Sequence, residues 1–221
     1  MVVTILLIVV AYCWGAIPVS NYLVKAIRGV DLREYGSGSV TSSNAGEVLG
    51  RWATVLAGAI DVLKGAAPVW AAQSLDQGVA QQMAAGIAGL VGHNWSMWVG
   101  FKGGRGFTIL LGLLLAIARL ELLLFTMVAL FGIAFWGAVP LFLGFSAALL
   151  PLWSWMFERD LPYILGLGLA VAFILVKRVV GNRLPEDRSP RVFLYRLIFD
   201  RDTRRRQDWV RRRIEDPPRR P

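Results

Sequence analysis

The sequence is poor in cysteine, histidine and charge. Cys13 is the only cysteine and His93 the only histidine among 221 residues. A single cysteine excludes a disulfide framework, and the shortage of both residue types excludes a metal site built on several Cys or His ligands. Only 18% of the residues are charged, which excludes an ordinary soluble domain.

Apolar residues dominate the composition. The chain is 56% hydrophobic, with a mean hydropathy of +0.53, and this balance is typical of a polytopic membrane protein. The net charge of +9 does not indicate nucleic-acid binding, because the cations are spread over short loops and a C-terminal tail. The N-terminal stretch lacks a basic segment and a small-residue cleavage site, so we expect it to be a retained first helix.

Seven apolar segments approach the ~20 residues that a membrane-spanning helix needs. We therefore predict an all-α membrane domain over residues 1–180 with about seven transmembrane helices, followed by a basic tail over residues 181–221. A break near Gly137–Pro140 separates two of the segments, and a kink in one longer element is the alternative. The segments are Val3–Val24, Trp52–Ala72, Met83–Phe101, Phe107–Ala118, Leu122–Val139, Leu141–Phe157 and Tyr163–Val176.

Cations mark one side of the predicted bundle. The first, third and final connections carry them, and odd-numbered connections share one membrane face. Because cytoplasmic loops are enriched in Lys and Arg, we expect a multi-pass protein of the cell inner membrane with its N-terminus outside and its tail inside. Residues 181–221 contain 13 Arg against 7 acidic residues. Within them Val192–Phe199 indicates an interfacial helix on anionic lipid, with a solvated tail as the alternative.

The glycine-rich octet Gly100–Phe107 (GFKGGRGF) follows the third segment directly. Glycines allow successive backbone N–H groups to converge on an anion, and Lys102 and Arg105 add formal charge. A bound phosphate at the membrane surface is the simplest functional interpretation. A tight turn whose cations only fix topology is the alternative. The candidate phosphate-binding residues of this loop are Lys102, Gly103, Gly104, Arg105 and Gly106.

A second small-residue loop, Gly36–Ser39 (GSGS), continues into Val40–Asn44 (VTSSN). Its glycines and hydroxyls suit a flexible anion cradle, in which a hydroxyl also serves as nucleophile or proton carrier. A flexible linker is the usual explanation for such a loop. The predicted topology places it on the same face as the glycine-rich octet.

Ionisable residues also lie inside the predicted membrane segments. Asp61 and Lys64 are three residues apart, which places them on one helix face within pairing distance. Charges in a membrane usually face the bundle interior and mark function, while a structural ion pair is the alternative. His93 suits proton transfer at neutral pH, although a structural hydrogen bond is the more frequent role of a lone helical histidine.

In this order and spacing, four stretches resemble the bacterial acyl-phosphate:glycerol-3-phosphate acyltransferase family (PlsY). The likeness runs from about Val9 to Thr108. The matching stretches are GVDLREYGSGSVTSSN (Gly29–Asn44), Leu49–Gly50, DVLKG (Asp61–Gly65) and GHNWSMWVGFKGGRG (Gly92–Gly106).

The resemblance implies seven membrane helices and transfer of a fatty acyl group from acyl phosphate to the 1-hydroxyl of glycerol 3-phosphate. The product is lysophosphatidic acid, for phospholipid synthesis, and no metal or coenzyme is implied. Membrane lipids are the other expected partners, and the oligomeric state is left open. By position the resemblance assigns Ser37, His93 and Lys102 to catalysis, with Asp61 and Lys64 in support. It assigns phosphate binding to Gly36, Gly38, Ser39 and the octet residues named above.

The sequence departs from the family pattern at several positions. Ser39 replaces an asparagine, TSSN replaces G-A-T-N, and Glu47 stands where the family carries arginine. Lys177–Asn182 (KRVVGN) replaces a His-Arg-Glu-Asn-type motif, which leaves Asn182 as the only amide near the lost one. These departures favour an alternative function, a catalytically impaired paralogue that binds lipid or acyl phosphates. A transporter of anionic metabolites ranks last, since no paired half-repeats are visible.

Overall fold

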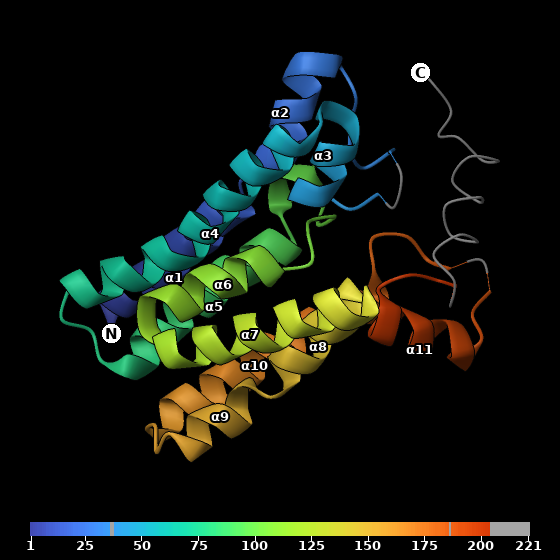
Figure 1. Ribbon diagram of the computed structural model, residues 1–221. Helices are drawn as coiled ribbons and strands as arrows, with labels where there is room; N and C mark the ends of the chain where they lie inside the picture. Colours follow the sequence, from blue (N-terminus) through green and yellow to red (C-terminus); the bar gives the residue numbers. More distant parts are fainter. Residues whose placement is uncertain (36–37, 186, 204–221) are drawn as a thin grey trace.

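The computed structural model is an all-helical bundle (Figure 1). It describes residues 1–35, 38–185 and 187–203. Within these ranges every regular element is a helix and β-strands are absent. The helices are α1 (Val2–Ala16), α2 (Val19–Arg28), α3 (Ser42–Leu49), α4 (Arg51–Ser74), α5 (Val79–Asn94), the 3₁₀ helix η1 (Met97–Val99), α6 (Phe107–Ile117), α7 (Arg119–Trp136), α8 (Val139–Ala148), α9 (Leu150–Met156), α10 (Leu161–Val180) and α11 (Pro190–Phe199).

In the described part of the chain, seven helical segments follow the predicted order. Five of them are long and apolar enough to cross a membrane, namely α1 with α2, α4, α7, α8 with α9, and α10. The other two are shorter, since α5 has 16 residues and α6 has 11. The break near Gly137 separates two helices, α7 and α8, because Gly137 adopts a left-handed conformation with φ 62° and ends α7.

The third segment was predicted too long. We expected a span over Met83–Phe101, but α5 ends at Asn94. The following residues bind α1 instead of continuing the helix: Trp95 accepts a hydrogen bond from Tyr12 at 2.8 Å, and the Ser96 hydroxyl donates to the Ala16 carbonyl. The third connection therefore lies partly inside the bundle.

Successive segments run in opposite directions, and hydrogen bonds show which connections meet. At one end the side chain of Asn182 donates to the carbonyls of Gly38 and Gly103, and Arg178 donates to Pro140. We call this the loop end; it gathers the first, third, fifth and final connections. At the opposite end, the far end, Arg159 of the sixth connection pairs with Glu121 at the start of α7, just after the fourth.

Small residues let the helices pack closely. A Cβ atom on Gly15 would overlap the Gly89 backbone of α5, and one on Gly112 would overlap the Val62 carbonyl of α4. Close backbone approach at small residues is how membrane helices gain packing energy, because lipid gives no hydrophobic drive for helix association. The closely packed pairs α1–α5 and α4–α6 hold the segments that carry the connections of the loop end.

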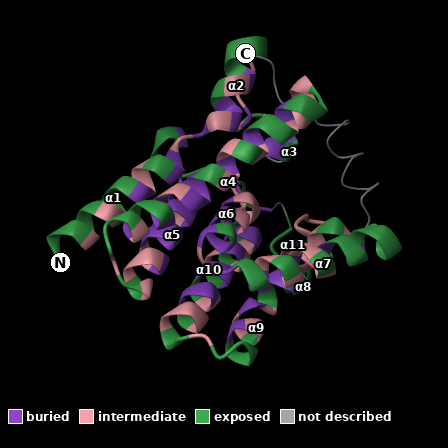
Figure 2. Cartoon of the chain, turned by 60° about the vertical axis from the view of Figure 1, so that its left-hand side comes forward, coloured by how far each residue is buried: buried purple, intermediate pink, exposed green. Residues whose placement is uncertain are grey.

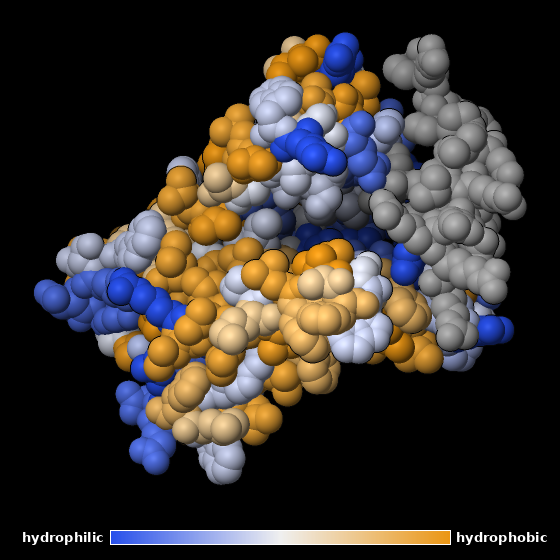
Figure 3. Space-filling view, viewed as in Figure 1, coloured by the Kyte–Doolittle hydropathy of each residue, from blue (hydrophilic) through white to orange (hydrophobic). Residues whose placement is uncertain are grey.

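The outer surface is apolar along the bundle. Figure 2 shows buried residues on the inward faces of the helices and exposed ones outside, and Figure 3 shows hydrophobic residues over much of the visible side. Exposed large side chains include Leu6, Val55, Leu130 and Leu165. A bundle this apolar on its outside is suited to lipid rather than to water.

Helix α11 packs across the loop end, beside the end of α10 (Figure 1). The Arg196 guanidinium donates to the carbonyls of Val179 and Val180, at 3.4 and 3.2 Å, and to that of Arg183 at 3.0 Å. The Val179 and Val180 carbonyls have no helical partner because α10 ends at Val180. The predicted amphipathic segment Val192–Phe199 is thus helical and is held by α10.

Candidate active site

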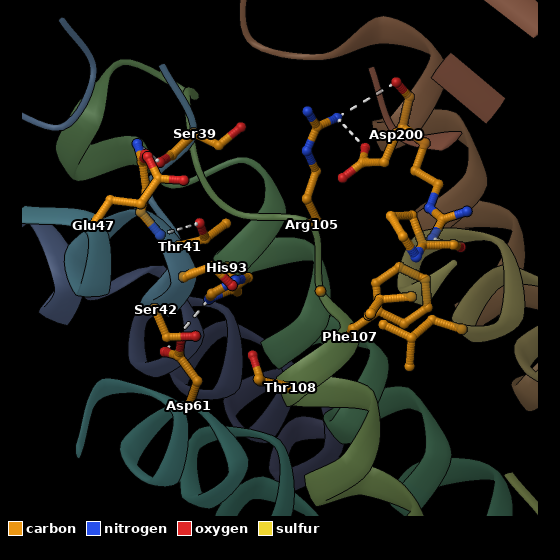
Figure 4. Close-up of a pocket in the computed structure, with 17 residues that line it drawn as sticks. Ser39, Thr41, Ser42, Glu47, Asp61, His93, Arg105, Phe107, Thr108 and Asp200 are labelled. Atoms are coloured by element: carbon orange, nitrogen blue, oxygen red, sulfur yellow. Dashed lines mark hydrogen bonds and ion pairs between the residues drawn. The ribbon is translucent and has the colours of Figure 1, made fainter. Parts of the chain in front are cut away.

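A cavity of about 360 Å³ opens at the loop end. Figure 3 shows a hollow with hydrophilic residues inside it, and Figure 4 shows side chains from distant parts of the chain pointing into it. Its volume lies in the range of small-molecule sites, roughly 300–1,000 Å³. The residues that line it are Ser39, Thr41, Ser42, Ser43, Asn44, Glu47, Asp61, His93, Arg105, Gly106, Phe107, Thr108, Val139, Pro140, Leu143, Arg178 and Asp200.

The glycine-rich octet lies directly on the end of α5. The Gly104 N–H donates to the His93 carbonyl at 3.0 Å. A Cβ on Gly103 would overlap that same carbonyl, and one on Gly104 would overlap the His93 imidazole. Gly106 adopts φ 84°, a conformation that side chains disfavour. The glycines are therefore required first by close approach to α5, and this places His93 against the loop.

The structure changes the expected place of His93. The predicted span Met83–Phe101 put it near the middle of a membrane segment, but it lies at the C-terminal end of α5 and lines the cavity. The reason is the early end of α5, after which the chain folds back over its last turn.

The first connection is more ordered than expected. We predicted Val40–Asn44 as part of a flexible loop, whereas Ser42–Asn44 form the first turn of α3. Thr41 caps this helix, because its hydroxyl accepts from the Asn44 N–H at 3.3 Å. The Asn44 side chain in turn donates to the Ser39 carbonyl at 3.0 Å and holds the loop to the helix.

Two helix N-termini consequently face one cavity. Ser42 and Ser43 begin α3, and Phe107 and Thr108 begin α6; all four line the cavity. The first N–H groups of a helix lack intrahelical partners and carry partial positive charge, so they attract anions such as phosphate. The cavity is therefore suited to bind more than one anionic group.

Asn182 joins the two glycine-containing loops. Its side-chain nitrogen donates to Gly38 of the first loop at 3.0 Å and to Gly103 of the second at 2.8 Å. The Val40 N–H also donates to the Gly103 carbonyl, at 3.4 Å. Sequence reasoning named Asn182 only as the nearest amide; the structure shows that it fixes the spacing of the loops.

Two arginines supply positive charge to the cavity. Arg105 of the octet donates to the Lys177 and Arg178 carbonyls at the end of α10, and its guanidinium lies 3.0 Å from the Asp200 carboxylate. Arg178 is buried over the Phe107 ring, 4.7 Å from its centroid. Neither Arg178 nor Asp200 was predicted as a site residue. Arg178 lies in the KRVVGN stretch that replaces the family motif, and no local signal distinguishes Asp200 from other residues of the basic tail.

The intramembrane pair forms as its spacing predicts. Lys64 Nζ lies 3.0 Å from Asp61 Oδ1, both side chains are buried, and Lys64 also donates to the Ile17 carbonyl at the α1–α2 break. His93 Nδ1 lies 3.7 Å from the same Asp61 oxygen. The other oxygen, Asp61 Oδ2, is buried without a hydrogen-bond partner among the described residues. A carboxylate beside His93 thus faces the cavity with one acceptor unsatisfied.

The other residues named from the sequence divide between the cavity and its surroundings. Lys102 is exposed and does not line the cavity. Glu47 does line it. Gly36 and Ser37 lie outside the described residues. Within the described ranges, no group of three or more His, Cys, Asp or Glu side chains is arranged to hold a metal ion.

Fold and site together define a multi-pass membrane protein with a cavity at one end of its bundle, lined by two arginines and two helix N-termini. The sequence profile of the glycerol-3-phosphate acyltransferase family matches residues 5–184. A glycerol-3-phosphate acyltransferase of Gloeobacter violaceus is 33% identical over 192 residues, covering 82% of this chain and 91% of that protein. Glycerol-3-phosphate acyltransferase 5 of Dehalococcoides mccartyi is 32% identical over 220 residues, covering 95% and 94%.

Solved structures agree. The crystal structure of PlsY (YgiH), an integral membrane glycerol 3-phosphate acyltransferase, in its glycerol 3-phosphate form, superposes with a TM-score of 0.74 at 27% identity, covering 79% of this chain and 88% of that chain. The chain belongs to the glycerol-3-phosphate acyltransferase family, and the predicted resemblance is confirmed. It is an acyltransferase of the membrane, and the impaired-paralogue alternative is not favoured.

Proposed function

We propose that this enzyme transfers a fatty acyl group from acyl phosphate to the 1-hydroxyl of glycerol 3-phosphate and releases lysophosphatidic acid and phosphate. The observation that carries the proposal is the convergence of two helix N-termini and two arginines on one cavity. Both substrates present a phosphate, and a cavity with two helix N-termini accommodates two such groups.

The reaction needs the acceptor oxygen to attack the carbonyl carbon of the acyl phosphate. A carbon–oxygen bond forms, the bond from that carbon to the phosphate oxygen breaks, and the hydroxyl proton is taken up by a base. Arg105, Arg178 and the N–H groups of the α3 and α6 N-termini neutralise the charge that develops on the departing phosphate. Holding the two substrates side by side supplies much of the rate.

His93 is our candidate for the proton transfer. It lines the cavity, and the Asp61 carboxylate 3.7 Å from Nδ1 orients the imidazole and stabilises its protonated form. Ser37, a candidate hydroxyl from the resemblance, lies outside the described residues. We assign Lys102 a smaller role, because its exposed ammonium adds positive charge near the loop without lining the cavity.

The acyl chain requires an apolar wall beside these polar groups. Val139, Pro140 and Leu143 of α8 line the cavity opposite α3, together with Phe107 of α6. This wall supports an arrangement in which the phosphate faces the loops and the acyl chain leaves toward lipid.

We place the loop end in the cytoplasm. It carries more cations than carboxylates, with Lys25, Arg28 and Arg33 near the first connection and Lys102 and Arg105 in the third. The far end has only Arg119 and Arg159, against the carboxylates of Asp76, Glu121, Glu158 and Asp160. The excess of cations supports a cytoplasmic loop end and an external N-terminus.

Phosphate release tests the reaction. The purified protein in lipid, given palmitoyl phosphate and glycerol 3-phosphate, should release phosphate and form lysophosphatidic acid only when both substrates are present. His93→Gln should reduce turnover while leaving phosphate binding intact. Release without glycerol 3-phosphate, or equal turnover by His93→Gln, would contradict the reaction or the role of His93.

Single cysteines test the orientation. In a Cys13→Ser background, Asp76→Cys at the far end should react with a membrane-impermeant maleimide on intact cells. Lys102→Cys should react only in inverted vesicles. The opposite labelling pattern would reverse the topology.

A further inference from the structure

The cavity has one wall residue that lies beyond the residues matched by the family profile. Asp200 follows α11, and the family profile ends at residue 184. Asp200 has φ 56°, so the chain turns sharply where α11 ends. Figure 4 shows its carboxylate on the side of the cavity across from Ser39 and Glu47, directed at Arg105.

The position of Asp200 is fixed from two sides. Arg178 donates to the Leu197 carbonyl of α11 at 3.0 Å and to the Pro140 carbonyl of α8 at 2.7 Å. Arg196 binds the last carbonyls of α10 as described above, and it pairs with Asp202. These contacts bring the end of α11 to the cavity, and so Asp200 does not reach Arg105 by a loose surface contact.

The Asp200 carboxylate pairs with Arg105, the cation that a bound phosphate would need. Arg105 is the octet's only cation in the cavity wall, and its Nη1 lies 3.0 Å from Asp200 Oδ1. A guanidinium binds carboxylate and phosphate oxygens with the same planar set of donors. Nη1 directs its hydrogen bonds to the Lys177 and Arg178 carbonyls, and Asp200 Oδ1 balances its charge as an ion pair. An anion entering the cavity at Arg105 therefore meets a cation whose charge is already balanced.

We propose that Asp200 competes with a substrate phosphate for Arg105, so that α11 acts as an internal strap that a bound phosphate must displace. The inference rests on the proposed function, because it assigns Arg105 to phosphate. A phosphate monoester carries more negative charge than one carboxylate, and it also gains the N–H groups of the two helix N-termini. Displacement of Asp200 by substrate is thus favourable once both sets of contacts form.

The electrostatic setting of Asp200 agrees with a displaceable group. Burial raises the pKa of its carboxyl above the ordinary value, while Arg105, Arg178 and Arg196 act in the opposite direction. Desolvation is the larger effect on this pKa, so burying the charged carboxylate costs free energy. That cost is removed when the carboxylate leaves Arg105 and enters water.

Competition of this kind has a measurable size. When only a fraction of molecules has a free binding group, the apparent dissociation constant rises by the inverse of that fraction. If Asp200 occupies Arg105 in about nine of ten molecules, removing its charge strengthens phosphate binding about tenfold.

The test compares Asp200→Asn with the wild type. Inorganic phosphate is the probe, and its dissociation constant is obtained from the rise of the thermal unfolding midpoint with phosphate concentration, since a ligand of the folded state stabilises it. Asp200→Asn should bind phosphate about tenfold more tightly. In turnover assays its KM for glycerol 3-phosphate or for acyl phosphate should fall, with a smaller change in kcat.

Asp187→Asn is the matched control. It removes an exposed carboxylate that accepts hydrogen bonds from Ser189 just before α11 and does not line the cavity. Phosphate affinity should stay within about twofold of the wild type. If both variants bind phosphate more tightly to the same extent, the effect comes from loosening α11 or from net charge, and the specific competition is wrong.

A second control removes the contested cation. In an Arg105→Ala background, Asp200→Asn should no longer strengthen phosphate binding. If Asp200→Asn weakens phosphate binding or raises KM, the carboxylate orients Arg105 and the inference is overturned. Unchanged binding, or the absence of phosphate binding in both proteins, overturns it too. The proposed function fails separately, through lack of turnover, because the phosphate titration needs no reaction.

Discussion

The two ends of the bundle both bury charged groups, but they satisfy them differently. At the far end the Glu121 carboxylate is fully buried, and it accepts from Ser154 at 3.1 Å and from Arg159 at 3.1 and 3.4 Å. At the loop end Asp61 Oδ2 and both amide atoms of Asn94 are buried without hydrogen-bond partners among the described residues.

The difference separates structural charges from functional ones. A buried carboxylate with all its partners holds helices together, and breaking such a pair mainly costs stability. Unsatisfied groups are costly, and they persist where a ligand completes them. The loop end therefore has the properties of a site prepared for a polar ligand. The far end has those of a fully hydrogen-bonded structural contact between α7, α9 and the sixth connection.

Arg105→Ala should have the largest effect on activity. The variant removes the octet's cation from the cavity wall, and kcat/KM should fall by about 10²–10³, as for loss of a donor to a developing charge. Phosphate release with both substrates measures it. Lys102→Ala is the matched control on the same loop; since this side chain is exposed, we expect a loss of about fivefold or less. A larger loss for Lys102→Ala would show that the loop turns inward on binding.

Gly104→Ala should lower activity by about 10² while leaving the bundle folded. The new methyl group would overlap the His93 imidazole, so the loop must shift away from α5. A displacement of about 1 Å in an active site can lower the rate about a hundredfold. Gly168→Ala in α10 is the control, because its Cβ would meet only Pro151 at 3.8 Å. Equal turnover of the two alanine variants would mean that the loop does not need its contact with α5.

Asn182→Ala should reduce activity about 10–30-fold. It removes two hydrogen bonds that tie the loops together, each worth about 1 kcal/mol. Asn182→Asp should be no better, because a carboxylate cannot donate to the two carbonyls. Michaelis constants for both substrates measure the effect, and a change in only one of them would show that Asn182 contacts that substrate instead of spacing the loops.

Arg159→Ala should have the smallest effect on activity and a clear effect on stability. The buried Glu121 loses its ionic partner, and the free energy of unfolding should fall by about 1–3 kcal/mol. In a chain of this size each kcal/mol lowers the thermal midpoint by roughly 2–4 °C. Turnover per folded molecule should match the wild type. A loss of turnover without loss of stability would break the distinction between the two ends.

Much of the fold was predictable because apolar run length and loop charge are local properties. The segments around α1–α2, α4, α6, α7, α8–α9 and α10 were placed within a few residues, and the i, i+3 spacing predicted the Asp61–Lys64 pair. The end of α5 was not predicted, because Trp95 and the residues that follow are as apolar as the residues of a membrane-spanning helix. Their hydrogen bonds to α1 decide where the helix ends, and those partners lie about 80 residues away in sequence.

The candidate site was predictable only in part. Gly103, Gly104, Arg105 and His93 could be named from the glycine-rich octet and the lone imidazole. Asp200 and Arg178 could not, because their place in the cavity depends on how α11 lies across α10 and α8.

The sequence by itself determined the membrane class, the order of the segments and the fact that the two glycine-containing loops emerge at the same end of the bundle. These follow from the length of the apolar runs and from the alternation of crossings. The tertiary structure alone decided which cation of the octet faces the cavity. Gly100, Phe101 and Gly106 adopt positive φ values of 63°, 61° and 84°, and the resulting turns expose Lys102 while directing Arg105 inward. Side-chain direction depends on backbone dihedrals that packing against α5 imposes, and residue type alone does not encode it.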